Sequence, residues 1–530
     1  MTRTDRSTRR QIRRLAALGA AAAAAILLSA CTAVSPPAPN SSASPALDRF
    51  YGQGIDFGLC AEFAQTETAS ALFASESLEC AHLEVPMDYT APSEERMRIG
   101  VLRVPAQGSP EERLGSLVIN PGGPGESGML IAAALSLRLA ESPVLQRFDL
   151  VGFDPRGVGA STPSIRCFSD AERDAGEAKT TLVGASGTWT EEDTAALVEK
   201  CAEASGGEEV LAAVGTRDAA RDIDVLRAVL GDEKLTFFGM SYGTRLGAVY
   251  AEQFPENVRA MVLDGAVDPR ADGEGQRIAT LAGFQRSFEQ LAAYCAESAD
   301  CPLGTDPGQA TRAFQQLVHP LVHQPAPAGD GRTADFDQVI GGVGASLYTR
   351  EGWDAAIAGI AQLKNEGRAD QLLALNDLYT GRGSDGVWST FLDANFAINC
   401  MDEERRTPAA ETDLRAQVAA TSPWLDSGED FAGSTRHACE AWPADPTLGF
   451  PYAQDISGLP DTLVISITGD PSTPYDGGVS LAESLGSALL TVEGERHTIA
   501  LQGISPCVDQ AVADYLIDLT LPAEGARCTL

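Results

Sequence analysis

The sequence predicts an α/β protein, in which a mostly parallel sheet has helices on both faces and is interrupted by a large, mainly helical insertion. Three observations carry this prediction. Short apolar runs alternate with amphipathic stretches from about residue 80, the alternation stops near residue 271, and it resumes near residue 459. Strands that alternate with helices over short connections are typical of parallel sheets. A long insertion between strands usually serves function, for example as a lid over a site.

Apolar runs predict the strands of the first part of the sheet, at 98–104, 115–120, 148–153, 235–238 and 258–263. A helix over 217–230 is indicated by apolar residues at helical spacing, among them Ile223 and Leu226. A second helix is predicted over 244–254, directly after a strand. These elements place the first part of the α/β core in residues 49–270.

The predicted insertion, which we call the cap, covers residues 271–458. One helical face in it is marked by Leu281, Phe284, Phe288 and Leu291, and further helices are predicted at 353–363 and 372–379. The alternation then resumes with a strand at 462–468, a helix at 479–485 and a strand at 488–492. We expect residues 459–530 to complete the core.

The N-terminus has the layout of an export signal. Residues 1–14 carry six arginines and one acid, and residues 15–30 are uncharged and rich in Ala and Leu. This apolar run is short for a membrane-spanning helix, which needs about 20 residues. A basic segment followed by a short apolar segment and small residues is typical of a signal peptide, here residues 1–30.

The expected cleavage point resembles a bacterial lipobox, since Leu28-Ser29-Ala30 precedes Cys31. This resemblance implies that Cys31 is lipidated and becomes the first residue of the mature protein. Residues 31–48 are rich in Pro, Ser and Ala, a composition that cannot form a core, and they are expected to be a tether. Arg9-Arg10 loosely resembles a twin-arginine signal. The general secretory (Sec) route and the twin-arginine route both stay open. The predicted location is the outer face of the cytoplasmic membrane or the cell envelope, or outside the cell after release.

Charge and cysteine content exclude some functions. The chain has 39 Lys and Arg against 74 Asp and Glu, a net charge of −35, and such a surface repels phosphate backbones, so nucleic-acid binding is not expected. No Cys-x-x-Cys pair occurs, and His319 and His323 lack the Glu of a His-Glu-x-x-His site, so neither a metal nor another cofactor is expected.

Setting Cys31 aside leaves ten cysteines, an even number that favours disulfides in an exported chain. Spacing does not fix connectivity; pairing between sequence neighbours gives Cys60–Cys80, Cys167–Cys201, Cys295–Cys301, Cys400–Cys439 and Cys507–Cys528.

A candidate nucleophile lies in Gly239-Met240-Ser241-Tyr242-Gly243, which follows a predicted strand and opens a predicted helix. That context is the one that a nucleophile elbow requires. The serine of such an elbow sits in a strained turn, so the residues two positions away must be small, and both are glycines.

A serine hydroxyl is a weak nucleophile and needs a base and a group that orients the base. His497 lies just after the last predicted strand of the core, and Asp470 ends the strand before it. Asp461 and Asp476 are competing acids, but neither ends a strand. The order Ser, Asp, His along the chain matches α/β-hydrolases and differs from the two common protease orders.

Catalysis at a carbonyl also needs donors for a developing oxyanion. The run Asn-Pro-Gly-Gly-Pro-Gly at 120–125 follows an early strand, and its glycines allow close approach to a substrate. We expect the backbone amides of Gly123 and Tyr242 to form the oxyanion hole. A phosphate loop is the alternative, but the Gly-Lys-Ser/Thr ending is missing.

Four motifs together resemble secreted actinobacterial tripeptidyl aminopeptidases, which belong with proline iminopeptidases in the α/β-hydrolase superfamily. They are Asn-Pro-Gly-Gly-Pro-Gly at 120–125, Asp-Pro-Arg-Gly-Val-Gly-Ala-Ser at 154–161, Gly-Met-Ser-Tyr-Gly-Thr at 239–244 and Gly-Asp-Pro-Ser-Thr-Pro-Tyr at 469–475. The stretches 80–89 and 397–402 resemble further family signatures. The resemblance covers roughly residues 50–530. It implies a serine exopeptidase that removes short peptides or residues from free N-termini through an acyl-enzyme intermediate.

The chain departs from the family pattern at two points. Proline iminopeptidases carry a His where Pro121 stands, and Glu495-Arg496 precedes His497 where relatives commonly have a Gly beside the histidine. Neither departure touches the predicted triad. Two other functions stay open: the same triad could cleave esters, as in a carboxylesterase or lipase, or the chain could be a lipoprotein that only binds a ligand.

An aminopeptidase must hold the ammonium group of its substrate, and an ammonium removed from water needs a carboxylate partner. The cap is the natural place for that carboxylate, because it should cover the cleft above Ser241. Asp402 and Glu403 follow Cys400, which a disulfide could hold in place. We therefore expect Asp402 or Glu403 to contact the substrate amino group. The expected partners are a peptide with a free N-terminus and, through Cys31, a membrane.

Overall fold

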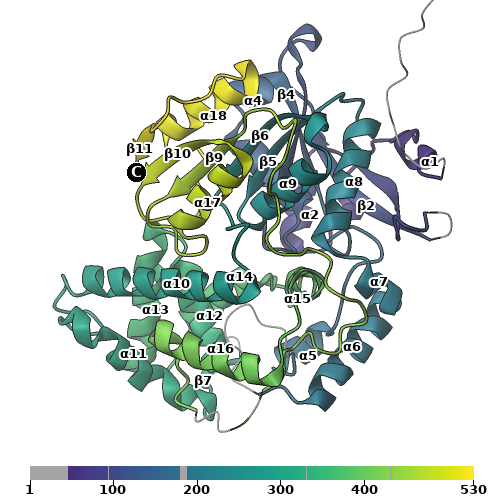
Figure 1. Cartoon of the computed structure of the whole chain (residues 1–530). Helices are drawn as coiled ribbons and strands as arrows, with labels where there is room; N and C mark the ends of the chain where they lie inside the picture. Colours follow the sequence, from purple (N-terminus) through teal and green to yellow (C-terminus); the bar gives the residue numbers. More distant parts are fainter. Residues whose placement is uncertain (1–45, 93–94, 179–187, 330, 430–432, 434) are drawn as a thin grey trace, which may run out of the picture. The chain divides into compact units, whose positions relative to one another are not determined.

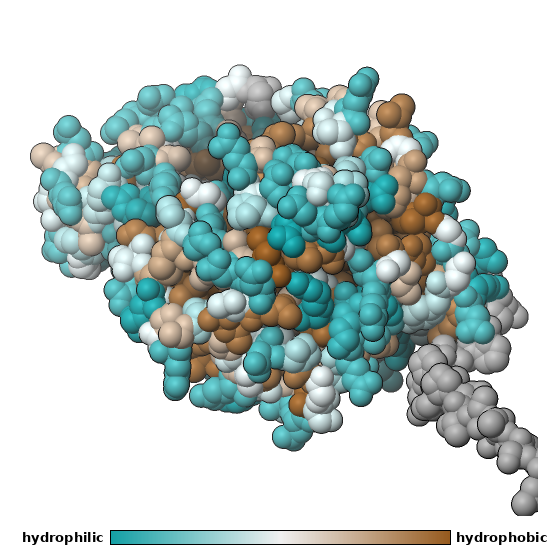
Figure 2. Space-filling model, turned by 90° about the horizontal axis from the view of Figure 1, so that it is seen from above, coloured by the Kyte–Doolittle hydropathy of each residue, from teal (hydrophilic) through white to brown (hydrophobic). Residues whose placement is uncertain are grey.

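The computed structural model describes residues 46–92, 95–178, 188–329, 331–429, 433 and 435–530. The predicted signal peptide, Cys31 and most of the predicted tether lie outside the described residues. Among the described residues, no helix is both long and apolar enough to cross a membrane. Hydrophilic side chains predominate on the face shown in Figure 2, with apolar side chains scattered between them.

The centre of the fold is a nine-stranded sheet, counted over the described residues, with the order β1-β2-β4-β3-β5-β6-β9-β10-β11 (Figure 1). The β1–β2 and β2–β4 pairs are antiparallel, and every pair from β4 to β11 is parallel. The bounds are β1 Glu79–Pro86, β2 Arg96–Val104, β3 Gly115–Asn120, β4 Phe148–Phe153, β5 Leu235–Met240, β6 Val258–Asp264, β9 Leu463–Ile467, β10 Ala488–Glu493 and β11 Arg527–Thr529. The predicted mostly parallel sheet is confirmed; β1 and β11 were not predicted.

Helices cover both faces of this sheet because successive strand residues point to opposite sides. Phe237 of β5 packs in one apolar cluster with α8, α9 and α17, and Phe238 packs in another with α3, α4 and α18. Strands β3, β4 and β5 have six residues each, and all of these residues are buried, as expected for the centre of a parallel sheet. The helices of the core, taken over both faces of the sheet, are α1 Asp48–Tyr51, α2 Glu67–Phe73, α3 Gly128–Arg138, α4 Pro143–Arg147, α8 Thr216–Val229, α9 Tyr242–Gln253, α17 Tyr475–Leu485 and α18 Pro506–Asp518.

The predicted cap is helical and has an apolar core of its own. Between β6 and β9 the chain forms α10 Gly273–Cys295, α11 Ala310–Val318, α12 Phe336–Ser346, α13 Trp353–Glu366, α14 Asp370–Thr380, α15 Phe391–Asp402 and α16 Pro408–Thr421, with a short β7–β8 hairpin at Ala326–Pro327 and Thr333–Ala334. Phe288 of α10 stacks on Trp424 with ring centroids 5.5 Å apart, and Phe314 of α11 packs against both. The cap therefore has a packed interior that is separate from the two faces of the sheet.

A second segment joins the cap, although the sequence analysis placed it in the first part of the core. Helices α5 Asp170–Asp174, α6 Glu191–Ser205 and α7 Glu208–Ala212 lie between β4 and β5. In Figure 1 they lie beside α15. Arg173 forms a buried ion pair with Asp393 of α15, and the Trp189 amide donates to Thr435 Oγ1 at 2.9 Å. The helical part opposite the carboxyl ends of the strands thus comes from two stretches of the chain.

The five predicted disulfides are confirmed. Within the described residues the bonded pairs are Cys60–Cys80, Cys167–Cys201, Cys295–Cys301, Cys400–Cys439 and Cys507–Cys528. Disulfides form and persist in oxidising compartments, so five of them indicate a protein that resides outside the cytoplasm.

The Cys507–Cys528 bond holds the short edge strand β11 to α18, and its removal should destabilise the core. It closes a separation of 21 residues, against 6 for Cys295–Cys301. Loop-closure entropy predicts that the double serine variant Cys507→Ser/Cys528→Ser loses about 3 kcal/mol of unfolding free energy and Cys295→Ser/Cys301→Ser about 2 kcal/mol. Urea unfolding followed by fluorescence checks both values. Unchanged midpoints in both variants would contradict the role given to these bonds.

Candidate active site

Ser241 sits in a strained turn between β5 and α9, as predicted. Its backbone has φ +55° and ψ −125°, a region that residues other than glycine rarely occupy. The two glycines allow this turn: a Cβ atom at Gly239 would lie 2.3 Å from Gly243 O, and one at Gly243 would lie 2.4 Å from Asn120 O. The Ser241 amide donates to Asp264 O at 2.9 Å, which ties the turn to the end of β6.

His497 and Asp470 are brought together, also as predicted. His497 Nδ1 lies 2.9 Å from Asp470 Oδ2 and 3.0 Å from Oδ1. The Asp470 carboxylate is fully buried and accepts from the amides of Ser472 and Thr473, each at 2.8 Å, and from Thr473 Oγ1 at 2.9 Å. These donors fix the carboxylate, and the carboxylate orients the imidazole. The competing acid Asp476 is exposed in the first turn of α17 and makes no described contact with His497.

The imidazole and the serine both lie close to the end of β6. The Ser241 amide is bonded to Asp264, and a Cβ atom at the next residue, Gly265, would lie 3.2 Å from His497 Cε1. Among the described residues, no hydrogen bond joins Ser241 Oγ to His497. Catalytic hydrogen bonds are often long without substrate and shorten in the complex. The geometry is that of a serine placed beside a histidine that a buried carboxylate orients.

The glycine-rich loop at 120–125 packs directly on the elbow. A Cβ atom at Gly122 would lie 2.9 Å from Ser241 Cβ and 3.0 Å from Tyr242 N, so only glycine fits there. Tyr242 is the first residue of α9, and its amide has no intrahelical acceptor. Gly123 lines the same cavity as Ser241. The structure therefore brings the loop that carries Gly123 to the Tyr242 amide, the pair predicted to form the oxyanion hole.

Two further carboxylates surround His497, and sequence reasoning missed both. Burial lowers the pKa of His497, but the charge and hydrogen bond of Asp470 and the charges of Asp264 and Glu126 outweigh it, so the pKa is raised above its ordinary value. Burial raises the pKa of Glu126 to about 7, although the His497 charge opposes this shift. Burial also raises the pKa of Asp264 to about 6, and the amides of Ile499 and Ala500, which donate to Asp264 Oδ2, counteract it.

The signals for these two carboxylates were present in the sequence. Glu126 comes directly after the glycine-rich run, and Asp264 ends β6 at the same edge of the sheet as Ser241. The carboxyl ends of parallel strands meet at one edge of a sheet, so the sequence could have placed both carboxylates near Ser241.

Ser241 opens onto a cavity of about 890 Å³ between the core and the cap. This volume is within the range of about 300–1,000 Å³ that is typical of small-molecule sites. The cavity is lined by Gly123 and Tyr242 from the core and by residues of α10, α15 and α16 from the cap. The predicted cap thus covers the nucleophile.

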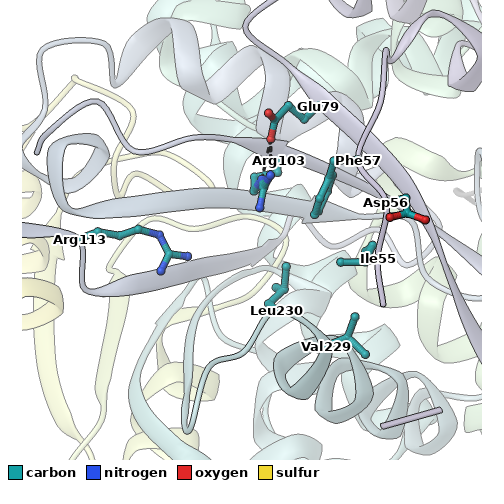
Figure 3. A pocket seen from close by; sticks show the side chains of 8 residues that line it. All are labelled: Ile55, Asp56, Phe57, Glu79, Arg103, Arg113, Val229 and Leu230. Atoms are coloured by element: carbon teal, nitrogen blue, oxygen red, sulfur yellow. Dashed lines mark hydrogen bonds and ion pairs between the residues drawn. The ribbon is translucent and has the colours of Figure 1, made fainter. Parts of the chain in front are cut away.

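A smaller cavity of about 350 Å³ lies away from these residues (Figure 3). Two arginines line it, and each already has an acidic partner: Arg103 contacts Glu79 at 2.5 Å, and Arg113 contacts Asp149 at 2.7 Å. It contains none of the predicted site residues, so the larger cavity is the candidate active site.

The structure does not place Asp402 at the cavity, so of the two residues predicted to contact the substrate amino group only Glu403 can reach it. Asp402 is fully buried at the end of α15 and is absent from the cavity wall. It accepts from Thr216 N at 3.1 Å and from Thr216 Oγ1 at 2.6 Å, and Arg245 Nη1 lies 3.4 Å away. Its carboxylate therefore neutralises a buried arginine and ties α15 to α8.

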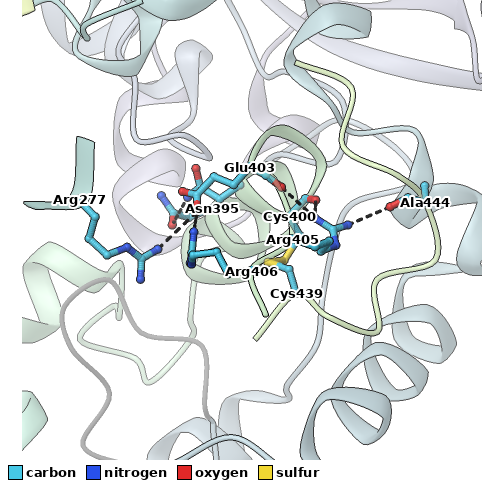
Figure 4. The surroundings of a disulfide bond; sticks show 9 residues. Arg277, Asn395, Cys400, Glu403, Arg405, Arg406, Cys439 and Ala444 are labelled. Carbon is cyan, nitrogen blue, oxygen red and sulfur yellow. Dashed lines mark hydrogen bonds and ion pairs between the residues drawn. A yellow bond between two sulfur atoms is a disulfide. The ribbon is translucent and has the colours of Figure 1, made fainter. Parts of the chain in front are cut away.

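Glu403, the other predicted anchor, does line the cavity. Its carboxylate lies 3.3 Å from Arg406 Nη1 and 3.6 Å from Arg277 Nη2 (Figure 4). Burial acts to raise the pKa of Glu403, but the charges of Arg277 and Arg406 outweigh it and the pKa is lowered, so the group is ionised at neutral pH. The Cys400–Cys439 bond holds the end of α15 that precedes Glu403.

Replacing a member of the Ser241, Asp470 and His497 set should abolish turnover. Loss of a triad member removes at least about 10³-fold in kcat. We expect this loss in Ser241→Ala, His497→Ala and Asp470→Asn, measured with an activated ester on purified, folded variants. Asp476→Asn is the matched control and should stay within about threefold of the parent enzyme. A crippled Asp476→Asn beside an active Asp470→Asn would show that the acid is wrongly assigned.

Removing the Glu126 charge should shift the pH profile. The carboxylate raises the pKa of His497, and activity requires a neutral imidazole as base, so Glu126→Gln should lower the pKa of His497. The acid limb of kcat/KM against pH is then expected to move to lower pH. The shift should be a fraction of a pH unit, because Glu126, with a pKa of about 7, is only partly ionised in the pH range of the acid limb. An acid limb that stays in place, or moves to higher pH, would contradict this electrostatic coupling.

Comparisons with known proteins identify the family of the chain. The family model described as the alpha/beta hydrolase fold matches residues 115–503. Serine protease Hip1 of Mycobacterium tuberculosis is 42% identical over 461 residues, covering 85% of this chain and 87% of the relative. Carboxylesterase B of the same species is 37% identical over 524 residues, covering 97% and 99%. Tripeptidyl aminopeptidase of Streptomyces lividans is 28% identical over 476 residues, covering 85% and 83%.

Matches to solved structures are weak in both identity and TM-score. A proline iminopeptidase of Mycobacterium smegmatis matches with a TM-score of 0.35 and 13% identity, covering 83% of this chain and 99% of that one. The family match and the coverage of the curated relatives, together with the Ser241 elbow and the oriented His497, lead to one conclusion. The chain belongs to the α/β-hydrolase fold family and is a serine hydrolase of the group that contains Hip1 and carboxylesterase B.

Proposed function

We propose that this protein is an exported serine aminopeptidase that releases short peptides, tripeptides among them, or single residues from free N-termini. The observation that carries the proposal is the cavity of about 890 Å³, which starts at Ser241 and is covered by the cap. A cavity of this size, with one wall formed by the cap, can hold a few residues of a chain end. The similarity to a tripeptidyl aminopeptidase supports the same substrate class.

The catalytic cycle follows from the contacts at Ser241. Ser241 Oγ attacks the scissile carbonyl carbon while His497 Nε2 takes its proton, and Asp470 stabilises the resulting imidazolium. The amides of Gly123 and Tyr242 donate to the oxyanion. His497 then gives the proton to the leaving amine as the C–N bond breaks, and the acyl group stays on Ser241. A water molecule, deprotonated by His497, hydrolyses the ester and restores the serine.

The charge of the cavity wall supports an ammonium-bearing substrate. Among the described residues, six carboxylates and four arginines line it; the acids are Asp268, Glu403, Glu411, Asp426, Glu429 and Asp476, and the arginines are Arg245, Arg277, Arg286 and Arg415. Glu403 is the acid that the cap presents from the end of α15. Its ionised carboxylate can accept a hydrogen bond from the substrate amino group while it keeps Arg406 as a neighbour.

Ester hydrolysis is the second candidate function. The wall of the cavity also carries large apolar side chains, among them Phe284, Phe336 and Phe396. The 37% identity to carboxylesterase B over nearly the whole of both chains favours an acyl-ester substrate equally. The same triad, oxyanion hole and acyl-enzyme serve both reactions.

We further propose that the mature protein is anchored through a lipid on Cys31, on the outer face of the cytoplasmic membrane or in the cell envelope. The basic and apolar signal segment and the lipobox-like sequence support this, and the disulfides fit the same compartment. Cys31 itself lies outside the described residues.

Blocking the substrate amino group separates the two functions. If the protein is an aminopeptidase, N-acetylation of a good tripeptidyl amide should nearly abolish cleavage, while short acyl esters are unaffected. Glu403→Gln should raise KM for the free-amine peptide by about 10- to 100-fold, since a charge-assisted hydrogen bond is lost. The neighbouring, exposed Glu404 provides the matched control, Glu404→Gln, which should change KM less than threefold. Equal cleavage of acetylated and free peptides would refute the aminopeptidase proposal and leave the esterase.

A further inference from the structure

One cap segment is bonded directly to the loop that carries His497. The His497 amide donates to Tyr348 O at 2.8 Å, and Thr349 forms an antiparallel bridge with Arg496. These bonds pair the segment after α12 with the segment after β10, two stretches about 150 residues apart in sequence. The position of the imidazole is therefore set from the cap as well as from Asp470.

The side chain of Tyr348 adds a second contact. Its ring meets the His497 ring edge-on, with centroids 5.4 Å apart and an interplanar angle of 63°. Edge-to-face packing of this kind restricts how an aromatic ring can turn. Asp470 holds the imidazole at Nδ1, and Tyr348 packs against the ring itself.

Tyr348 follows cap helix α12 and is held by two others, α10 and α14. Its hydroxyl lies 2.7 Å from the hydroxyl of Tyr379 in α14, and its ring packs edge-on against Phe284 of α10 at 5.2 Å. In addition, Ser287 Oγ of α10 donates to the carbonyl of Leu347, which follows α12. The ring that touches His497 is thus fixed by the cap interior and cannot turn independently of it.

The histidine loop needs such support. Thr498, directly after His497, has φ +55°, a conformation that is strained for a β-branched residue. On the other side, Arg496 Nη1 reaches Glu351 of the cap at 3.2 Å. The loop is therefore strained at one neighbour of His497 and tied to the cap at the other.

Tyr348 also faces the substrate. Both Tyr348 and Tyr379 line the cavity that contains Ser241. We propose that Tyr348 is a positioning residue: it couples the cap, and any substrate that packs on the Tyr348–Tyr379 pair, to the orientation of His497. This proposal rests on the assignment of His497 as the catalytic base, but it holds for peptide and ester substrates alike.

The test separates positioning of the base from lining of the cavity. A small fluorophosphonate reacts with an activated serine and makes little use of the large cavity, so its labelling rate reports the Ser241–His497 pair. Tyr348→Ala should slow labelling and lower kcat for a short ester by about 10- to 100-fold, since small misplacements of catalytic groups cost this much. The KM for that ester should change less than threefold. Tyr348→Phe keeps the ring and the backbone bond and should label within about threefold of the parent.

Tyr294→Ala is the matched control, because Tyr294 is a cap aromatic of α10 that packs on Trp353 and is absent from the cavity wall. It should leave both the KM for the ester and the labelling rate within about threefold of the parent. If Tyr348→Ala fails to fold, Tyr348→Leu takes its place, since it fills the space without a ring. Labelling of the ring-less variant at the parent rate would overturn the proposal, and so would an equal loss in Tyr294→Ala. Labelling of Ser241→Ala at the parent rate would instead overturn the assignment of Ser241 as the nucleophile, on which the proposed function rests.

Discussion

The strained backbone of Ser241 is the constraint on which the site depends. A residue with a side chain stays at φ +55° only when its surroundings leave no alternative. The surroundings here are close backbone approaches at Gly239 and Gly243, together with the bond from the Ser241 amide to Asp264 O. All of them require β3, β5 and β6 to lie side by side in a buried parallel sheet. The packing of that sheet therefore holds the serine in its reactive orientation.

The rest of the site divides between the core and the cap. The core supplies Ser241, the glycine-rich loop and Asp470, each at the carboxyl end of a strand. The cap supplies most of the cavity wall and, through Tyr348, a second support for His497. Negative charge is concentrated around the imidazole, because Asp264 and Glu126 lie near it in addition to Asp470. This environment favours the imidazolium that forms when Ser241 loses its proton.

Much of this architecture could be predicted because it depends on local patterns. The elbow has a short motif in a strand-to-helix setting, the buried strands are apolar runs, and the disulfides join sequence neighbours. Several of the features that were missed depend on distant partners. Asp402 and Glu403 are adjacent acids, and only the packing of α15 on Thr216 and Arg245 buries the first and leaves the second at the cavity. Strand β11 has three residues, too few for a pattern, and is defined by its pairing with β10.

The account rests on one chemical claim, that Ser241 is the nucleophile and carries the acyl group. Mapping the covalent adduct after reaction with a fluorophosphonate tests it most directly. Digestion and mass spectrometry should find one adduct, on the peptide that contains Gly239-Met240-Ser241-Tyr242-Gly243, at close to one per molecule and absent from His497→Ala over the same time. An adduct on another residue, or an active enzyme that is never labelled, would contradict the account.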